Sequence, residues 1–248
     1  IRLSFRGEAL LHNKFIDAIK YAKSKGIKEV STLTNGAKLS LDFFKKIADA
    51  GIDWITISVD GTGEVYENIR KPITFDNIYQ KIKNIHEYKK NHNLKRPVIK
   101  VQGIWPAIQK DVQKYYDTFA PIADLVAFNP LIDYLFNDTE IEYEENFTCP
   151  QQYQRLVIGA DGLVMKCSND EENIDVVGDA NKQSVSEIWH GEKLNAIRKM
   201  QLEENGFLKS DVCKRCYVPR LTDEEIHQVS GRKFKVKNYI GRSQKIGT

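Results

Sequence analysis

The stretch Trp54-Ile55-Thr56-Ile57-Ser58-Val59-Asp60-Gly61 joins a short apolar run to a polar turn that contains glycine. Short runs of this kind, rich in Val, Ile and Leu, are typical of strands covered on both faces. Four more runs of the same character lie at residues 1–5, 29–33, 98–104 and 125–128. Longer stretches with a helical period separate them. This alternation predicts an α/β fold in which right-handed crossovers build a parallel sheet or barrel.

The stretches between the runs carry the stripes and caps of helices. Phe15, Ile19 and Ala22 recur at spacings of four and three residues, and Gly26 suits the left-handed conformation that ends many helices. Ser40 and Thr74 precede the next apolar stripes, and their side-chain oxygens can accept hydrogen bonds from the first turn of a helix. We therefore expect a helix after each of these two residues.

Polar, glycine-containing segments follow the first three predicted strands. They are Arg6-Gly7-Glu8, Thr34-Asn35-Gly36 and Asp60-Gly61-Thr62-Gly63. Ligands of parallel α/β folds bind at the carboxyl ends of the strands, and glycine lets the backbone approach a ligand closely. The sequence therefore predicts a binding site at this edge of the sheet.

Composition excludes several classes of protein. The 248 residues carry 37 Lys and Arg against 34 Asp and Glu, so the net charge of +3 is too small and too dispersed to indicate nucleic-acid binding. No apolar run approaches the roughly 18 residues of a membrane-spanning helix, and residues 1–5 do not resemble a signal peptide. We expect a cytoplasmic protein with neither nucleic acid nor membrane as a partner.

The composition changes after the last predicted strand. We divide the chain into a first domain at 1–130, a connector at 131–146, a second domain at 147–221 and a tail at 222–248. The connector carries six acids and no base between Asp133 and Glu145. A hairpin turn at residues 159–162 and a capping box at residues 184–187, with a helix break at Gly191, define the second domain. From Ile226 onward six bases and no acid predict a solvated, partly ordered tail.

All four cysteines lie in the second domain. Cys213 and Cys216 form a C-x2-C knuckle that can grip a metal centre from a tight turn, whereas seventeen residues separate Cys149 from Cys167. Thiolates are soft ligands that suit both zinc and iron–sulfur clusters. Four cysteines are too few for the disulfide scaffold of a secreted protein. The residues alone therefore favour a metal centre over a disulfide and leave zinc and an iron–sulfur cluster both open.

Taken in order, the motifs resemble a known superfamily. Residues 5–11, the Thr34-Asn35-Gly36 turn, residues 57–61 and the Asn68-Ile69-Arg70-Lys71 segment followed by residues 74–77 are similar to radical S-adenosylmethionine (SAM) enzymes from their second barrel strand onward. In the second domain, a cysteine, a hairpin with Gly-x4-Cys from Gly162 to Cys167 and a C-x2-C resemble the SPASM/twitch auxiliary-cluster extension. Four cysteines match the shorter twitch form.

This resemblance implies the architecture. It gives a partial (β/α)6 radical SAM barrel that begins at its second strand, followed by a small α+β twitch auxiliary-cluster domain. The superfamily's cluster-binding C-x3-C-x2-C would precede Ile1 and does not occur in these residues. We interpret the chain as part of a longer protein, the alternative being a degenerate homologue that has lost catalysis.

The resemblance also implies roles for individual residues. Gly7 and Glu8 would bind the amino group of SAM through charge-assisted hydrogen bonds, although the superfamily's Gly-Gly-Glu-Pro reads Arg6-Gly7-Glu8-Ala9 here. Arg70 would pair with the methionine carboxylate. Asn35, Ser58 and Asp60 would lie near the ribose. The predicted ligands of an auxiliary [4Fe-4S] cluster are Cys149, Cys167, Cys213 and Cys216.

The implied function is an oxidoreductase. A second [4Fe-4S] cluster, on the upstream segment, would cleave SAM to a 5'-deoxyadenosyl radical that abstracts hydrogen from a carbohydrate-like or aminocyclitol molecule. The auxiliary cluster would accept the resulting electron, and a reductant such as flavodoxin or ferredoxin would serve the upstream cluster. A peptide-modifying maturase and a non-catalytic, four-thiolate zinc module are the alternatives. The sequence assigns no catalytic side chain.

Overall fold

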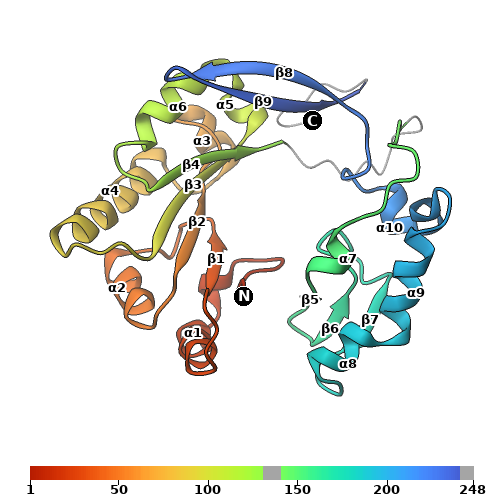
Figure 1. The fold of residues 1–248 in the computed structure, drawn as a ribbon. Helices are drawn as coiled ribbons and strands as arrows, with labels where there is room; N and C mark the ends of the chain where they lie inside the picture. The colour runs from red at the N-terminus through yellow and green to blue at the C-terminus, as the bar shows by residue number, and fades with distance from the viewer. Residues whose placement is uncertain (131–140, 241–248) are drawn as a thin grey trace. The chain divides into compact units, whose positions relative to one another are not determined.

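The computed structural model of the protein describes residues 1–130 and 141–240, which divide into two compact units (Figure 1). Among the described residues, the first unit comprises 1–130 and 224–236, and the second comprises 141–223 and 237–240. Each unit has an apolar core of its own. None of the helices in the described part of the chain is long and apolar enough to span a membrane.

A four-stranded parallel sheet organises the first unit. Its order is β1-β2-β3-β4, and these strands span Ser31–Thr34, Trp54–Ser58, Val98–Ile104 and Leu125–Asn129. Parallel pairing joins each strand to the next, with Ile55 opposite Ile99 and Val101 opposite Val126. The predicted parallel sheet is confirmed.

The two faces of the sheet differ in chemistry. In β3, Ile99 and Val101 are buried in the core, whereas Lys100 and Gln102 alternate with them and are half-buried on the other face. The apolar face packs against helices, and their buried stripes include Ile19, Phe44 and Ile82. Figure 1 shows these helices along one side of the sheet. Their bounds are α1 Phe15–Ser24, α2 Leu41–Asp49, α3 Glu64–Ile69, α4 Phe75–Asn91, α5 Trp105–Ile108 and α6 Val112–Phe119, with 3-10 turns at Ala9–Leu11 and Gln109–Asp111.

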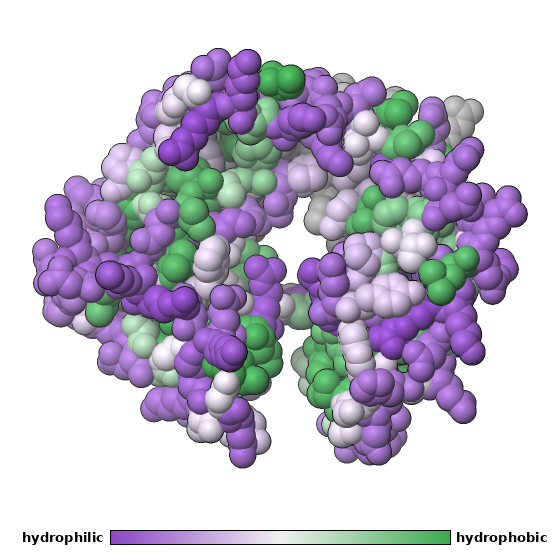
Figure 2. Space-filling view, in the orientation of Figure 1, coloured by the Kyte–Doolittle hydropathy of each residue, from purple (hydrophilic) through white to green (hydrophobic). Residues whose placement is uncertain are grey.

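The predicted helix starts are confirmed by their hydrogen bonds. Ser40 Oγ accepts from Phe43 N at 3.2 Å, and Thr74 Oγ1 accepts from Asn77 N at 3.3 Å. Gly26, just beyond α1, has φ +76°, a left-handed conformation that costs glycine little. Only one stripe of α4 is buried, and the outer surface over this helix is largely hydrophilic in Figure 2.

Residues 1–5 do not form the predicted strand. They run beside β1 with a single parallel bridge between Arg2 and Ser31, supported by a hydrogen bond from Leu3 N to Ser31 O at 2.7 Å. The chain then turns away, because Arg6 and Gly7 both adopt left-handed backbone conformations with φ of 51° and 63°. This turn carries the segment that follows to the carboxyl end of β1.

The second unit contains the predicted hairpin and helices. β5 (Val157–Ile158), β6 (Leu163–Met165) and β7 (Val176–Asp179) form an antiparallel sheet. The Ser184–Glu187 capping box is present, and Gly191 separates α8 (Val185–His190) from α9 (Glu192–Gln201). Val164, Val177, Ile188 and Leu194 form the core. The remaining short elements are α7 (Gln151–Gln154), a 3-10 turn at Gly206–Lys209 and α10 (Asp211–Lys214).

The predicted tail is instead largely a hairpin of β8 (Thr222–Val229) and β9 (Arg232–Tyr239). Val236 is 2% exposed in the core of the first unit, and the Phe234 ring lies 6.0 Å from that of Trp105. The tail was predicted from its number of basic residues, and the alternation of lysines with apolar residues was overlooked. Lys233, Lys235 and Lys237 flank apolar residues that share one face of a strand. Residues 241–248 lie outside the described residues.

The predicted acidic connector is described only in part, because residues 131–140 lie outside the described residues. Tyr143 forms an isolated antiparallel bridge with Arg220, and Glu144 N donates to Pro219 O at 2.7 Å. Residues 141–146 therefore pair with the end of the second predicted domain.

Candidate functional site

A pocket of about 610 Å³ opens beside the carboxyl ends of β1 and β2 in the first unit. It is lined by five of the six residues predicted to bind SAM, namely Gly7, Glu8, Asn35, Ser58 and Arg70. These residues come from the turn after the first segment, the loop after β1, the end of β2 and the end of α3. The parallel sheet brings them together because its strands all end at the same edge.

Glu8 is fixed at the end of β1. Its carboxylate accepts hydrogen bonds from Thr34 Oγ1 at 2.6 Å, Asn35 N at 2.7 Å and Leu10 N at 3.2 Å. A carboxylate has about four acceptor positions, so these contacts orient the group and leave capacity for a further donor. The Gly7-Glu8 turn is thus anchored to β1 before any ligand binds.

Arg70 carries a positive charge in the same pocket, held by Asp60. Its Nε and Nη2 lie 2.6 and 2.5 Å from Asp60 Oδ2, and the Asp60 residue is only 3% exposed. A buried carboxylate requires a partner of this kind. Asp60 does not itself line the pocket, and its described contact with the site is through Arg70. The sequence placed Asp60 beside the ligand and missed this ion pair.

Tyr66, on α3, is a further group close to this ion pair. It is fully buried, and its hydroxyl has no hydrogen-bond partner among the described residues. Burial raises the pKa of Tyr66 to about 12; Arg70 opposes this increase and Asp60 adds to it. The phenol is therefore neutral over the physiological range.

The four cysteines are free thiols in the second unit. Cys149 precedes α7, Cys167 follows β6, and the knuckle of Cys213 and Cys216 lies in and just after α10. Cys149 is half-buried and the others are buried. The knuckle turn is closed by a hydrogen bond from Cys216 N to Cys213 O at 3.1 Å, and the buried Arg220 donates through Nε to Cys216 O at 3.1 Å.

Each cysteine sulfur faces at least one N–H donor. Asn169 Nδ2 lies 2.9 Å and Val218 N 3.4 Å from Cys216 Sγ. Backbone N–H groups of Gln151 and Asn169 donate to Cys149 and Cys167. Gln201, 1% exposed, links two cysteines, since its Oε1 accepts from Cys149 N at 3.1 Å and its Nε2 lies 3.6 Å from Cys213 Sγ. Donors aimed at sulfur stabilise thiolates.

Three of the four cysteines have pKa values that other cysteines of the set raise further. Burial raises the pKa of Cys149, with Cys167 and Cys213 adding to the increase. Burial raises the pKa of Cys167 to about 11, and Cys216 and Cys213 add to it. The thiols are thus electrostatically coupled to one another. The described residues include no group of three or more His, Cys, Asp or Glu side chains placed to hold a single metal ion.

Sequence reasoning missed the side chains that support the sulfurs. Lys166, whose Nζ lies 3.3 Å from Cys213 Sγ, directly follows β6, in which Val164 and Met165 are both fully buried, and so continues a buried run. Gln201 follows Leu194 and Ile197 at helical spacing, which places it on the apolar stripe of α9. Both signals are legible in the sequence, but a polar residue at these positions is ordinarily taken as exposed.

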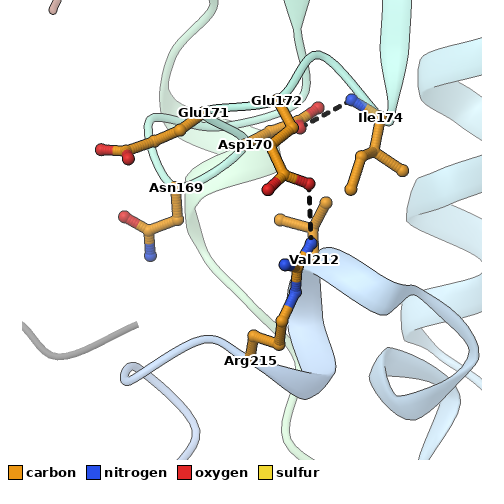
Figure 3. A pocket seen from close by; sticks show the side chains of 7 residues that line it. All are labelled: Asn169, Asp170, Glu171, Glu172, Ile174, Val212 and Arg215. Carbon is orange, nitrogen blue, oxygen red and sulfur yellow. Dashed lines mark hydrogen bonds and ion pairs between the residues drawn. The ribbon is translucent and has the colours of Figure 1, made fainter. Parts of the chain in front are cut away.

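A small pocket of about 60 Å³ lies beside the loop after Cys167 (Figure 3). Arg215 reaches from the knuckle to Glu172, with an N–O distance of 3.3 Å. The Asp170 carboxylate accepts from Ile174 N at 2.8 Å and from Asp175 N at 2.7 Å, so it shapes the loop from within. These contacts account for Asp170 and Glu172, two of the acids that line this pocket.

Two protein-family matches cover most of the described chain. Residues 3–103 match the Radical SAM superfamily, and this span includes all six residues predicted to bind SAM. Residues 149–217 match SPASM, an iron–sulfur cluster-binding domain, and this span includes all four cysteines.

Curated relatives match over shorter spans. The chain is 35% identical over 80 residues to an S-adenosyl-L-methionine-dependent 2-deoxy-scyllo-inosamine dehydrogenase of Niallia circulans, over 32% of each chain. It is 28% identical over 147 residues to a probable GTP 3',8-cyclase of Methanocaldococcus jannaschii, over 56% of this chain and 47% of the relative. The matches thus span about a third to a half of these relatives.

Solved structures share the fold. BtrN in complex with AdoMet and 2-DOIA matches 88% of this chain and 72% of its own, with TM-score 0.56 and 18% identity. Native anSMEcpe with bound AdoMet matches 86% and 73%, with TM-score 0.61 and 14% identity. The α/β architecture and the two family matches agree with the resemblance in the sequence. The chain therefore carries a Radical SAM superfamily domain at residues 3–103 and a SPASM iron–sulfur cluster-binding domain at residues 149–217.

Proposed function

We propose that the first unit binds SAM in the pocket between Glu8 and Arg70, and that the second unit holds an auxiliary [4Fe-4S] cluster through its four cysteines. The observation that carries the proposal is that five separately predicted residues line one pocket, with a carboxylate and a guanidinium already fixed in it. The ligand's amino acid part offers an ammonium and a carboxylate, which are the complementary charges.

Each side chain of the pocket has a role in this proposal. The remaining acceptor capacity of Glu8 receives the ammonium in a charge-assisted hydrogen bond. Arg70 presents its planar donors to the carboxylate, and Asp60 keeps the guanidinium in place. Gly7 is exposed, and a Cβ added there would meet no atom within 4 Å, so the ligand can approach this backbone closely. The positive φ of Gly7 is what favours glycine at this position. Ser58 and Asn35 supply hydrogen bonds for the ribose.

The chemistry of the second site fits an iron–sulfur cluster. Four thiolates are the usual ligands of a [4Fe-4S] cluster, and N–H donors directed at all four sulfurs suit ligands that carry negative charge. Burial raises the pKa of Cys149, Cys167 and Cys216 in the metal-free protein. Loading the site must therefore release protons.

We propose a carbohydrate-like or aminocyclitol substrate and a flavodoxin or ferredoxin as reductant. SAM, bound and reduced at an upstream cluster, would supply a 5'-deoxyadenosyl radical for hydrogen abstraction, and an auxiliary cluster held by the four cysteines would supply an acceptor for the electron left on the substrate. The name of the Niallia circulans relative, a 2-deoxy-scyllo-inosamine dehydrogenase, supports this class of substrate. Residues 1–248 would contribute the SAM pocket and the acceptor site.

The test is formation of 5'-deoxyadenosine by a protein that contains this chain together with a C-x3-C-x2-C segment upstream. The protein is incubated anaerobically with SAM, dithionite and candidate aminocyclitols, and products are separated by chromatography. Glu8→Gln should reduce formation at limiting SAM, whereas Glu64→Gln, on an exposed residue outside the pocket lining, should not. Equal rates in the two variants would contradict the assignment of Glu8.

Substrate dependence decides between the two substrate classes. Stimulation by an aminocyclitol, with loss of two hydrogens from it, supports the dehydrogenase. Modification of a peptide in its place would identify a peptide maturase and overturn the substrate proposal.

A further inference from the structure

Lys166 is a fully buried lysine beside the proposed cluster ligands. It is 0% exposed, and its Nζ lies 3.3 Å from Cys213 Sγ. Nζ also contacts Ser210 Oγ and Asp175 Oδ2. An ammonium has three donors, and three acceptors surround this one.

The surrounding contacts hold Lys166 in this position. Ser210 caps α10, accepting from Cys213 N at 3.4 Å, and its hydroxyl also donates to Asp175 Oδ2 at 2.8 Å. Lys166 is thus tied to the N-cap residue of the knuckle helix and to the residue directly before β7. Its ammonium cannot leave Cys213 without breaking this network.

Burying an ammonium is costly unless partners compensate for its lost hydration. Asp175 compensates in part, but its side chain is 26% exposed and it has no described contact with a cysteine. The cation therefore faces the sulfur directly, while its counter-ion is partly screened by water. Among the described contacts of the four sulfurs, the other side-chain donors, Asn169 and Gln201, are neutral.

We propose that Lys166 is a positioning residue for electron transfer, which raises the reduction potential of the auxiliary cluster through Cys213. The inference rests on the proposed function of the four cysteines. When a cluster held by four thiolates takes one electron from a donor, no bond forms or breaks and its negative charge increases by one. A fixed positive charge near a ligand sulfur stabilises the reduced form more than the oxidised form. A higher reduction potential makes the cluster a better acceptor of the substrate electron.

The test is a potentiometric titration of residues 1–248 after anaerobic reconstitution, with dithionite as electron donor and electron paramagnetic resonance as the readout. The chain has four cysteines, so one cluster is measured. At the wild-type midpoint potential, Lys166→Gln should lower the reduced-to-oxidised ratio by about tenfold, which is about 59 mV for one electron. Lys182→Gln removes a lysine that is 80% exposed and should leave the midpoint unchanged.

Asp175→Asn is the second arm of the test. It leaves the Lys166 charge uncompensated, so the midpoint should move upward, opposite to Lys166→Gln. A general loosening of the site would move both variants in the same direction, and that result would overturn the proposal. A Lys166→Gln protein with full iron content and an unchanged midpoint would overturn it as well.

Iron and sulfide contents separate this inference from the proposed function. Wild-type protein that takes up no iron would reject the cluster itself. If Lys166→Gln alone fails to load, Asp175→Asn decides: an upward shift supports the role of the lysine, and an unchanged or lower midpoint contradicts it.

Discussion

At the scale of single residues, the SAM pocket is organised before a ligand arrives. Three donors orient the carboxylate of Glu8, and Asp60 holds the guanidinium of Arg70. Fixing charged groups in advance reduces the ordering cost of binding. The motif positions of Glu8 and Arg70 were readable in the sequence. The Asp60 pair was not, because it depends on how the end of α3 turns back toward the loop after β2.

Removing Arg70 should weaken SAM binding strongly. Arg70→Ala leaves Asp60 buried without its partner and leaves the methionine carboxylate unpaired, so we expect a loss of about 2–5 kcal/mol in binding free energy. Isothermal calorimetry on reconstituted protein with an upstream cluster segment measures it. Lys71→Ala removes an exposed neighbouring charge as the control. Equal affinities in the two variants would reject the assignment of Arg70.

At the scale of elements, two aspartates fasten strands of the sheet. Asp53, just before β2, accepts from Val30 N at 2.8 Å and pairs with Lys23 of α1, also at 2.8 Å. Asp124, just before β4, accepts from Ile99 N at 2.6 Å and pairs with Lys89 of α4. Each aspartate thus ties a helix to a neighbouring strand at the end of the sheet opposite the pocket.

Asp53 should make stability depend on pH. Burial raises the pKa of Asp53, but hydrogen bonds from Lys23 and Val30 N, with the charges of Lys23 and Arg96, lower it overall below 3.8. Its stabilising contribution is therefore present above about pH 4 and lost as pH falls. At pH 7, Asp53→Asn should reduce the free energy of unfolding by about 1.5–3 kcal/mol, as measured by urea denaturation.

A matched control is Asp42→Asn, which removes a carboxylate that is 88% exposed and 3.8 Å from Lys45. It should change the free energy of unfolding by less than about 0.5 kcal/mol. The difference between wild type and Asp53→Asn should shrink at pH 3. The same difference at pH 3 and pH 7 would show that the charge of Asp53 is not the cause.

The β8–β9 hairpin should be held by its aromatic contacts. Phe234 lies against Trp105 and Phe128, with ring centroids 6.0 and 5.3 Å apart. Phe234→Ala should therefore free the strands and speed tryptic cleavage at the exposed Arg232 and Lys233 by about tenfold, equivalent to about 1.4 kcal/mol of local opening. Gln228→Ala changes an exposed residue and should leave the rate unchanged. Equal cleavage of the two variants would reject the anchoring role.

The sequence predicted the strands of the parallel sheet well, but it did not predict the β8–β9 hairpin or the course of residues 1–5. β3 has the predicted bounds, because Val and Ile recur along it and mark the buried face of the strand. The β8–β9 hairpin was missed because its lysines alternate with few apolar residues, so that charge obscured the period. The strand predicted at residues 1–5 is only a single bridge at Arg2, because an apolar run does not reveal where the backbone turns left-handed.

At the scale of the whole molecule, each unit carries one proposed site. The ligand edge of the parallel sheet and the cysteine cluster were predictable, since both follow from order and spacing along the chain. The supporting residues Lys166 and Gln201 were not, because their contacts join segments 47 and 12 residues apart from Cys213 and depend on burial of polar groups. Those contacts are what the structure adds to the family match.

The central claim is that the four cysteines hold one [4Fe-4S] cluster. Residues 1–248 are reconstituted anaerobically, desalted, and assayed for iron, sulfide and zinc alongside the visible spectrum. We predict a brown protein with about four iron atoms and four sulfides per chain, and loss of both in Cys213→Ser. A colourless protein that takes up one zinc per chain and no iron would contradict the account.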